Sequence, residues 1–576
     1  MKNSRKSPEK SGKYILAKAM KEYGTKYVFG YTGGAIMPFF DELQQNFPGI
    51  KPIKVRHEQG AAFAAQGYAR ATGKIGFVAT TSGPGATNTV TGVADAMMDS
   101  VPIFVITGQV PTSVVGTDAF QESDMVGIMY PITKQAVMPY STDELAEKFF
   151  ELTQIATQGR PGPVHLDLPK DIQLDTSEKT TYKPTNKREY YPTEKVSQTT
   201  YDNAIALINK AKRPIVFCGH GVILANAGKA FTDFVEKCNI PFSTTLHGIS
   251  AVPSDHPLNL GMMGMHGTVA ANRAITSSDL IISLGMRFDD RVTAKLSEYA
   301  RNAQTIHVEI DASEIRKIVK TNIPINDDVK TAIKKFLSGA KRLPRKEWFS
   351  EIERNKQTWT KFISKQIRKG TGPNGRLLMK TVISRLSEIT KGQDNIVADV
   401  GQNQMMSARF YNYQRFNTHF SSGGLGTMGF SLPTAIGVKI ARPKERVWAI
   451  CGDGGLQMNI QELGTILEHK LDIDIILLNN GVLGMVRQWQ SLFFGKRYAE
   501  TDLTNPDFMK IAEAYGMPSR RVEKVTEIDS AIRWAMENKG PTLTEFVCDK
   551  DELIMPMIPA GATFEEMIET DNDINF

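Results

Sequence analysis

Short apolar runs separated by stretches of helical length dominate the hydrophobic pattern of this chain. Each run is followed by glycine-rich or polar residues, and in the first third of the sequence the runs cover residues 27–29, 75–80, 101–107 and 164–168. Continuous apolar runs are typical of strands in a parallel sheet that helices cover on both faces. The pattern therefore predicts an α/β domain that binds its ligands at the carboxyl ends of the strands.

The same pattern returns twice further along the chain. The second group of runs covers residues 215–218, 280–284 and 305–310, and the third covers residues 395–399, 447–450, 473–478 and 542–547. Polar residues 173–200 have little to bury and predict a linker, and a charged stretch predicts a helical connector at 341–375. We therefore expect three α/β domains, each a parallel sheet flanked by helices, at residues 10–172, 201–340 and 376–555, with a polar tail at 556–576.

The composition adds few restrictions. Of the 576 residues, 41% are hydrophobic and 23% are charged, and the net charge of +7 is small for this length. Basic residues gather at positions 2–26, where the short cluster favours a solvated leader over a nucleic-acid-binding arm. The four cysteines have no C-x-x-C spacing, and no apolar run reaches membrane length. We expect a cytoplasmic protein that binds neither nucleic acid nor a membrane.

Two strand ends of the third predicted domain carry hard oxygen ligands. The run at 447–450 leads into Gly452-Asp453-Gly454, and the run at 473–478 ends in Asn479-Asn480. Mg²⁺ accepts such a small ligand set when phosphate oxygens complete its coordination. Glycines beside Asp453 let a diphosphate approach the backbone, and the following helix would direct its N-terminus at it. Each half alone is more typical of a polar turn, but the pair together favours a metal–diphosphate site.

A carboxylate in the first predicted domain is a second candidate. Glu58 follows the end of a predicted strand and precedes a helix rich in small residues, where a ligand or another backbone can come close. The alternative is that Glu58 is simply an acidic residue favoured at a helix N-terminus. Together with the metal motif, the cofactor role is favoured.

Other signals are weaker when taken alone. The loop Ser422–Phe430 is rich in glycine, and its Met428, taken alone, is more typical of a core residue. Gly219-His220-Gly221 after a predicted strand only hints at a dinucleotide, because no full G-x-G-x-x-G follows. Arg291 offers a planar fork for a carboxylate, although an ion pair with a neighbouring aspartate is an alternative, and Trp489 could be a pocket wall or a core residue.

The paired motif at Asp453 and Asn480 resembles the GDG…NN signature of thiamine-diphosphate enzymes. Further motifs, in order along nearly the whole chain, resemble the large subunits of the acetolactate (acetohydroxyacid) synthase family: Gly30–Ala35, Arg56–Ala61, Gly116–Glu122, Gly264–Thr268, Arg287–Val292, Gly484–Trp489 and Pro556–Gly561. The resemblance implies pyrimidine-binding, central FAD-binding and diphosphate-binding domains. The chain departs from the family's common residues at Thr32, His220, Glu309, Asn403 and Met406.

The resemblance also implies cofactor ligands. Glu58 would exchange a proton with N1′ of the aminopyrimidine ring, and Met428 would wedge beneath the cofactor. Asp453, Asn480 and the carbonyl of Val482 would bind Mg²⁺. The thiamine diphosphate set is Glu58, Gln402, Asn403, Gly426, Met428, Asp453, Gly454, Gly455 and Asn480, and the catalytic set is Glu58, Gln121 and Met428.

Two further sets are carried over from the family. The FAD set is Arg160, Gly219, Gly221, Thr245, Leu246, Gly264, Met265, His266, Gly267, Arg287, Asp289, Arg291, Glu309 and Asp328. The substrate set is Gly34, Phe120, Gln121, Arg291 and Trp489. Within the family, the tryptophan position favours 2-ketobutyrate as the second substrate.

The activity that the resemblance implies is decarboxylation of pyruvate and ligation to a second 2-keto acid, in branched-chain amino acid biosynthesis. It also implies a homodimer or homotetramer with the active site at the subunit interface, and a possible small regulatory subunit. Two rival hypotheses are a flavin-using decarboxylase of the pyruvate oxidase kind and a catalytically silent scaffold that holds cofactors. The presence of Glu58 argues against the scaffold.

Overall fold

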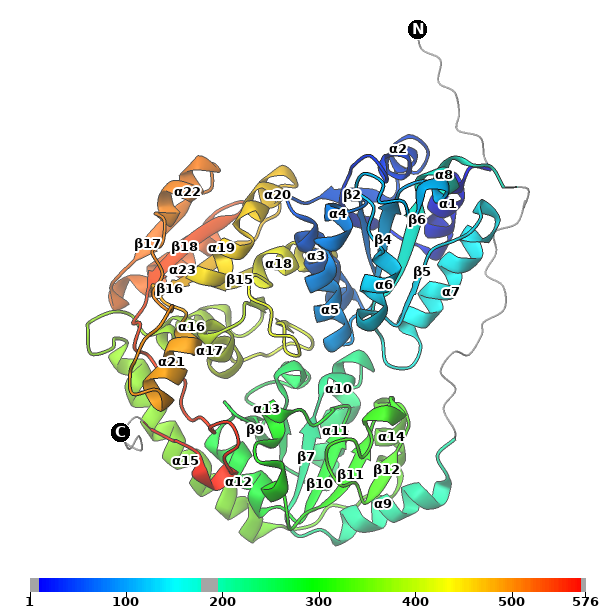
Figure 1. Ribbon diagram of the computed structural model, residues 1–576. Helices are drawn as coiled ribbons and strands as arrows, with labels where there is room; N and C mark the ends of the chain where they lie inside the picture. The colour runs from blue at the N-terminus through cyan, green and yellow to red at the C-terminus, as the bar shows by residue number, and fades with distance from the viewer. Residues whose placement is uncertain (1–9, 178–194, 571–576) are drawn as a thin grey trace. The chain divides into compact units, whose positions relative to one another are not determined.

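The computed structural model describes residues 10–177 and 195–570, in which three sheets of six parallel strands are flanked by helices (Figure 1). The α/β fold class expected from the sequence is confirmed. The described residues form two compact units. The first unit contains residues 10–177, 422–447 and 455–473, and the second contains residues 195–421, 448–454 and 474–570.

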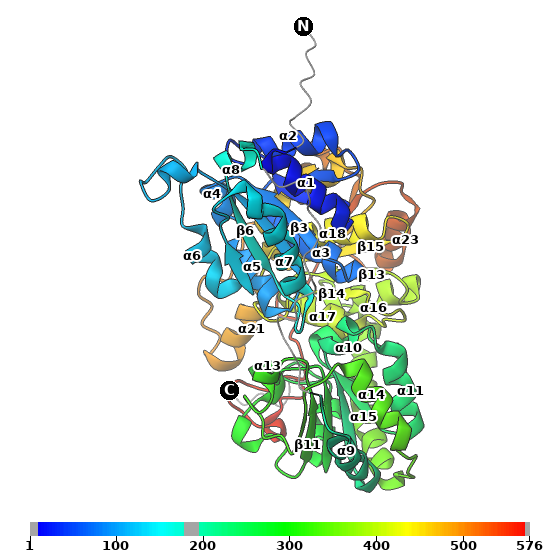
Figure 2. The same ribbon diagram turned by 90° about the vertical axis from the view of Figure 1, so that its right-hand side faces the viewer.

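The first sheet lies in the first unit. Its strands, in spatial order, are β2 (Lys51–Lys54), β1 (Tyr27–Tyr31), β3 (Gly76–Thr80), β4 (Ile103–Gln109), β6 (Val164–Pro169) and β5 (Gln135–Val137). One face packs on α1 (Gly12–Tyr23), α2 (Met37–Asn46), α7 (Leu145–Thr157) and α8 (Lys170–Leu174). Figure 2 shows this face, with α1 and α7 toward the viewer. On the other side lie α3 (Glu58–Thr72) and α5 (Val90–Met98), and short helices α4 (Pro84–Thr87) and α6 (Met125–Met129) complete the domain.

Helix α3 packs closely on α18 (Ser431–Ala441), which comes from the third predicted domain. Glycines on both helices make this approach possible. A Cβ atom on Gly437 would lie 1.8 Å from the Ala64 carbonyl oxygen, and one on Gly67 would lie 2.1 Å from that of Thr434. Any larger residue at either position would push the helices apart. The other helices that the third predicted domain contributes here are α19 (Asp453–Met458), which begins in the second unit, and α20 (Leu463–Glu468).

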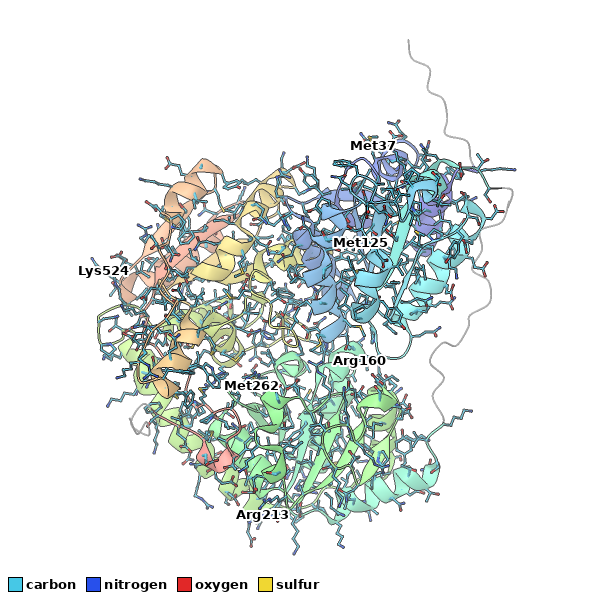
Figure 3. The ribbon with its side chains drawn as sticks, viewed as in Figure 1. Met37, Met125, Arg160, Arg213, Met262 and Lys524 are labelled. Atoms are coloured by element: carbon cyan, nitrogen blue, oxygen red, sulfur yellow. The ribbon has the colours of Figure 1, made fainter. Side chains whose placement is uncertain are left out.

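The central sheet lies in the second unit. Its spatial order is β12 (Ile323–Ile325), β11 (Gln304–Val308), β10 (Leu280–Leu284), β7 (Pro214–Cys218), β8 (Phe242–Thr244) and β9 (Asn259–Met262). One core cluster joins it to α9 (Gln198–Lys210), α10 (His220–Leu224), α11 (Gly228–Cys238) and α14 (Val329–Gly339), and another joins it to α12 (Val269–Ser277) and α15 (Lys346–Lys369). In Figure 3, Arg213, directly before β7, marks the amino ends of the strands, and Met262, the last residue of β9, marks the carboxyl ends.

The third sheet has the order β14 (His419–Phe420), β13 (Asn395–Ala398), β15 (Val447–Gly452), β16 (Asp474–Asn479), β18 (Thr542–Val547) and β17 (Ser519–Val522). Its core contains α16 (Met379–Thr390), α17 (Gln402–Phe410) and α23 (Ile528–Glu537). The remaining helices of the second unit are α13 (Asp290–Thr293), α21 (Gly484–Phe493) and α22 (Phe508–Ala514).

Every strand that the apolar runs predict is present, with small differences at the ends. The strands that the runs missed are short, and all but one lie at a sheet edge: β2, β5, β8, β9, β12, β14 and β17. Strand β2 illustrates the reason, because three of its four residues are exposed and two are lysines. An edge strand that faces water carries no continuous apolar run.

The expected boundaries between domains stay predictions. Residues 178–194 of the predicted linker and 571–576 of the predicted tail lie outside the described residues. Helix α15 occupies most of the predicted connector. In the predicted tail, Ile558 and Phe564 are buried in a core cluster of the central domain. Among the described residues, no helix is long and apolar enough to cross a membrane.

A buried polar cluster joins β4 to β6 in the first sheet. The Thr107 hydroxyl lies 2.7 Å from His165 Nε2 and donates to Asp167 Oδ1 at 2.7 Å. All three residues are at most 1% exposed. Burial lowers the pKa of His165 to about 3 and raises the pKa of Asp167 to about 7, because both charged forms lose their hydration. His165 is therefore neutral, and Asp167 can keep its proton close to neutral pH.

The two pKa shifts act on stability with opposite sign. The unfolded chain protonates His165 below about pH 6.5 while the folded protein does not, so this contribution is lost as the pH falls toward 3. The contribution of Asp167 is fully present below about pH 4 and is lost as the pH rises through about 7. Between about pH 4 and 6.5 the two contributions offset each other.

Replacing His165 by leucine is expected to uncover the Asp167 contribution. Relative to the variant, the wild type should gain about 1.4 kcal/mol of unfolding free energy per pH unit between about pH 4 and 6.5. Thr107 keeps Asp167 as its partner in the variant, so the carboxyl environment is retained. Hydrogen exchange of the buried β4 and β6 amides, converted to opening free energies at several pH values, measures the difference. Parallel pH dependences for the two proteins would contradict the assignment.

Candidate functional site

Three neighbouring strands of the third sheet bring polar residues to one edge. Strands β13, β15 and β16 lie side by side, and all run parallel. Beyond their carboxyl ends lie Gln402 at the start of α17, Asp453 at the start of α19, and Asn480 directly after β16. The sequence prediction that Asp453 and Asn480 share one edge of a sheet is thus matched by the strand order.

The Asp453 carboxylate is buried and held in place by hydrogen bonds. Only 2% of the residue is exposed, and Oδ2 accepts from the Gly481 amide at 3.0 Å and from Asn505 Nδ2 at 2.7 Å. Burial raises the pKa of Asp453, and these hydrogen bonds act in the opposite direction. Asn505 also donates to Asn479 Oδ1 at 3.0 Å. Sequence reasoning missed Asn505, which lies in a loop without any periodic signal.

The other diphosphate candidates, apart from Gly455, belong to the same unit as Asp453. Asn480 Nδ2 donates to Gln402 Oε1 at 3.2 Å, and Gln402 Nε2 donates to the Glu552 carbonyl at 2.7 Å. Asn403 Nδ2 donates to the Ile450 carbonyl at 3.2 Å. Gly454 and Gly455 continue α19 after Asp453, and Val482 is buried two residues after Asn480.

The chemistry of this donor set fits Mg²⁺ held jointly with a diphosphate. The carboxylate of Asp453, the amide oxygen of Asn480 and the backbone carbonyl of Val482 are all hard oxygen donors. Within residues 10–177 and 195–570, no group of three or more His, Cys, Asp or Glu side chains could hold a metal ion. Phosphate oxygens of a bound diphosphate would complete the coordination of a cation at Asp453.

Glu58 is the first residue of α3, in the first unit. Its Oε2 accepts from Asn88 Nδ2 at 3.0 Å, and the side chain is half-buried. His57 caps the helix, with Nδ1 accepting from the Gln59 amide at 3.2 Å. His57 therefore has a structural part at the start of α3. Asn88 follows the glycine-rich turn after β3 and was not predicted as a partner.

A second buried carboxylate fixes the chain just before α3. Glu462 Oε1 accepts from the amides of Arg56 at 3.1 Å and His57 at 3.0 Å, and Oε2 accepts from Thr465 Oγ1 at 2.6 Å. The side chain is fully buried, and burial raises its pKa. Glu462 therefore orients the turn that carries Glu58. It lies in the third predicted domain, and no local pattern linked it to residues 56–58.

The remaining candidates of the first unit lie in loops. Gly34 is exposed, and a Cβ atom there would meet nothing within 4 Å. Phe120 is 90% exposed, and Gln121 has a positive φ of 62°. Gly426 is exposed and Met428 is half-buried in the loop before α18. Arg160 also belongs to this unit, where its Nε donates to Ser100 Oγ at 2.7 Å.

The flavin candidates of the central domain follow its strands one by one. They lie beyond the ends of all six strands, at the carboxyl edge of one sheet: Gly219 and Gly221 after β7, Thr245 and Leu246 after β8, Gly264, Met265, His266 and Gly267 after β9, Arg287, Asp289 and Arg291 after β10, Glu309 after β11, and Asp328 after β12. Parallel sheets bind ligands along this edge.

Polar contacts hold several of these residues in place. Glu309 Oε1 accepts from the Ile310 amide at 3.0 Å, and Asp328 caps α14 by accepting from the Thr331 amide at 3.0 Å. Asn272, which was not predicted, is fully buried and exchanges two 2.9 Å hydrogen bonds with the Gly264 backbone.

One buried ring atom in this set fits a bound ligand. His266 Nδ1 makes no hydrogen bond with the part of the chain that the structure describes. Burial, with Arg409 and Arg291 nearby, lowers the pKa of His266 to about 3, so the ring is neutral. A neutral ring nitrogen can accept or donate one hydrogen bond to a flavin.

Two substrate candidates contact one cluster of methionines. Arg291 Nη1 lies 3.4 Å from Met265 Sδ, and its side chain is otherwise largely exposed beside Asp290. Trp489, in α21, packs on a cluster formed by Met265, Met555 and Met557. An arginine and a tryptophan beside one flexible apolar cluster can bind a small acid with an aliphatic tail.

The sequence of the chain matches three segments of one enzyme family. Residues 10–128 match the N-terminal TPP binding domain of thiamine pyrophosphate enzymes, residues 201–336 match their central domain, and residues 399–546 match their C-terminal TPP binding domain. Thiamine pyrophosphate is another name for thiamine diphosphate. The first segment contains β1 to β4 of the first sheet, the second contains the whole central sheet, and the third covers the third sheet from β14 onward.

Curated relatives match along nearly the whole chain. The acetolactate synthase large subunit of Lactococcus lactis subsp. lactis is 41% identical over 97% of this chain and 96% of its own length. The acetolactate synthase isozyme 2 large subunit of Escherichia coli is 40% identical over 97% of this chain and 99% of its own. A probable acetolactate synthase large subunit of Methanococcus aeolicus is 41% identical over 97% and 95%.

Proposed function

Because the chain belongs to the acetolactate synthase large subunits, a family of thiamine-diphosphate-dependent enzymes, we propose that it decarboxylates pyruvate and joins the remaining two-carbon unit to a second 2-keto acid. A second pyruvate gives 2-acetolactate, and 2-ketobutyrate gives 2-aceto-2-hydroxybutanoate. Both products lead to branched-chain amino acids.

The observation that carries this proposal is the placement of Asp453 and Asn480 beyond adjacent strands, where Gln402 accepts from Asn480 and donates to the Glu552 carbonyl. When bound, thiamine diphosphate supplies the electron sink for the electrons released when the 2-keto acid loses CO₂. Asp453, Asn480 and the Val482 carbonyl would hold Mg²⁺ on the diphosphate. Gln402, Asn403, Gly454 and Gly455 would line the same diphosphate.

The chain's own groups then manage protons and orientation. Glu58 would hold a proton at N1′ of the pyrimidine ring, and Asn88 keeps its carboxyl oriented through a 3.0 Å hydrogen bond. The Gly426 carbonyl would accept from the 4′-amino group, and Met428 would support the cofactor between its two rings. Arg291 would bind the acceptor's carboxylate, with Trp489 beside its alkyl group and Gly34, Phe120 and Gln121 closing the channel.

FAD is part of the proposal because the flavin candidates gather along one sheet edge and His266 offers a neutral ring nitrogen. An absorption spectrum of the purified protein tests this part, and a flavin band near-stoichiometric with protein is expected. We also propose a homodimer or homotetramer with 2-keto acids bound at the interface. A small regulatory subunit is a further proposed partner, since relatives carry the name large subunit.

Anaerobic mixing with pyruvate in the presence of all three cofactors tests the activity. We expect acetolactate to form, and we expect no reduction of the flavin at the rate of turnover. Complete bleaching of the flavin at that rate, with acetate and no acetolactate, would instead support the pyruvate oxidase-like alternative. Failure to consume pyruvate would support a scaffold.

Replacing Trp489 by leucine is expected to lower the preference for 2-ketobutyrate over pyruvate by about tenfold, because the pocket wall beside the extra methylene is lost. A competition assay with both acceptors, read as the product ratio, measures the effect. Trp534→Leu is a matched control, since this half-buried tryptophan packs on the α16–α23 core and has no part in the site. An unchanged ratio in Trp489→Leu would count against the pocket assignment.

A further inference from the structure

Two aspartates of α5 hold the glycine-rich loop that precedes α18. Asp99 accepts from the Gly423 amide at 3.0 Å and from the Gly424 amide at 2.7 Å, one with each carboxylate oxygen. Asp95 Oδ1 accepts from the Ser422 hydroxyl and, at 3.0 Å, from the Thr427 hydroxyl. The two carboxylates thus bind the loop on both sides of its tip.

Both aspartates are buried around a single arginine. Asp95 is 0% exposed and Asp99 is 2% exposed. Arg70 Nη2 lies 2.8 Å from Asp99 and 3.9 Å from Asp95, and its guanidinium lies 5.4 Å from the ring centroid of Phe430. Burial and the neighbouring Asp99 raise the pKa of Asp95 to about 6. Two buried carboxylates with one cation are costly to maintain unless each oxygen is well bonded.

The loop itself has little else to hold its tip. Leu425 is 45% exposed, and Gly426 is exposed and has a φ of 70°. Within the loop, the Ser422 hydroxyl also accepts from the Thr427 amide at 2.9 Å. Asp95 therefore fixes the Ser422 hydroxyl, and the hydrogen bond from the Thr427 amide to this hydroxyl closes the base of the loop.

We propose that Asp95 and Asp99 are positioning residues that set the conformation of residues 422–428 and thereby place the Gly426 carbonyl and Met428 for the pyrimidine ring of thiamine diphosphate. This inference rests on the proposed function. It assigns to α5 a part in cofactor binding that the cofactor's own ligand set does not contain.

The loop can be measured first in the protein without cofactors. Asp99→Asn leaves one strong acceptor for two amides, so we expect hydrogen exchange in the segment 422–428 to become about tenfold faster. The dissociation constant of thiamine diphosphate, titrated with Mg²⁺ present, should rise about tenfold as well. The circular dichroism band of the bound cofactor should change, because it reports the environment of the pyrimidine ring.

Glu42→Gln is the matched control. Glu42 is a fully buried carboxylate of the same unit and is paired with Lys13 at 3.5 Å. Its polar contacts are with Lys13 and Asn46, not with the loop at 422–428. We expect a change in stability there, with loop exchange and cofactor affinity equal to those of the wild type. If Asp99→Asn behaves like this control, the inference is overturned.

A double-mutant cycle isolates the Asp95 contact. Ser422→Ala removes one hydroxyl and is mild enough to fold, and it should raise the dissociation constant of the cofactor severalfold. In the double variant with Asp95→Asn, the increase in this constant should be smaller than the product of the increases in the two single variants. Multiplicative effects would overturn the inference. If the wild-type protein does not bind thiamine diphosphate, the proposed function is wrong. If the wild type binds it and the variants bind it with the same dissociation constant, only the positioning role of Asp95 and Asp99 is wrong.

Discussion

Replacing Glu58 by glutamine is expected to leave thiamine diphosphate bound while turnover falls by about 10²–10⁴-fold. The amide oxygen of glutamine can still accept from Asn88, so the side chain should keep its place. An amide cannot exchange a proton with a ring nitrogen, so the loss should fall on turnover and not on affinity. Turnover at saturating cofactor and calorimetric titration of thiamine diphosphate measure the two quantities separately.

Glu147→Gln is a suitable control for Glu58→Gln, because Glu147 is an exposed acidic residue in the first turn of α7. The control should match the wild type in both measurements. Near-normal turnover in Glu58→Gln would refute the proton-exchanging role. Lost affinity without any change in saturated turnover would reduce Glu58 to a binding contact.

Replacing Asp453 by asparagine is expected to weaken Mg²⁺-dependent binding of thiamine diphosphate by at least about 100-fold. Asparagine keeps one oxygen for the Gly481 amide and Asn505, so the loop should hold its shape. The buried charge is removed, and with it the desolvation that raises the pKa of Asp453. The protein without cofactor should therefore be as stable as the wild type or more stable.

Thermal unfolding with and without Mg²⁺ and thiamine diphosphate separates these effects, because a bound cofactor raises the midpoint by an amount that grows with the logarithm of its affinity. The wild type should show a cofactor-dependent increase that Asp453→Asn lacks. Asp474→Asn is the matched control, since Asp474 is a buried carboxylate at the opposite end of β16, bonded to Thr542 at 2.7 Å. An equal increase in all three proteins would remove Asp453 from the metal site.

The sequence predicts the fold as far as buried strands carry continuous apolar runs. Strands such as β4 and β16 are buried over almost their whole length, and their apolar runs predict them. Edge strand β5, with three half-buried residues, has no such signal. The helix contact between α3 and α18 depends on Gly67 and Gly437, whose separation in the sequence hides their proximity.

The candidate site divides in the same way. Asp453, Asn480 and Glu58 stand at strand or helix ends, where local pattern and residue type together indicate chemistry. Glu462 and Asn505 act through contacts with distant backbone and side chains, which only the folded chain creates. A single sequence contains no local signal for such contacts.

The first compact unit takes residues from two distant parts of the chain, and this affects how the protein is made. Helix α3 emerges from the ribosome early, but its partner α18 and the segment that carries Glu462 follow about 360–390 residues later. At about 5–20 residues per second, the interval is about 20–80 s. During synthesis, the small-residue face of α3 is therefore exposed for that time, and chaperones that bind nascent chains have a defined surface and period in which to act.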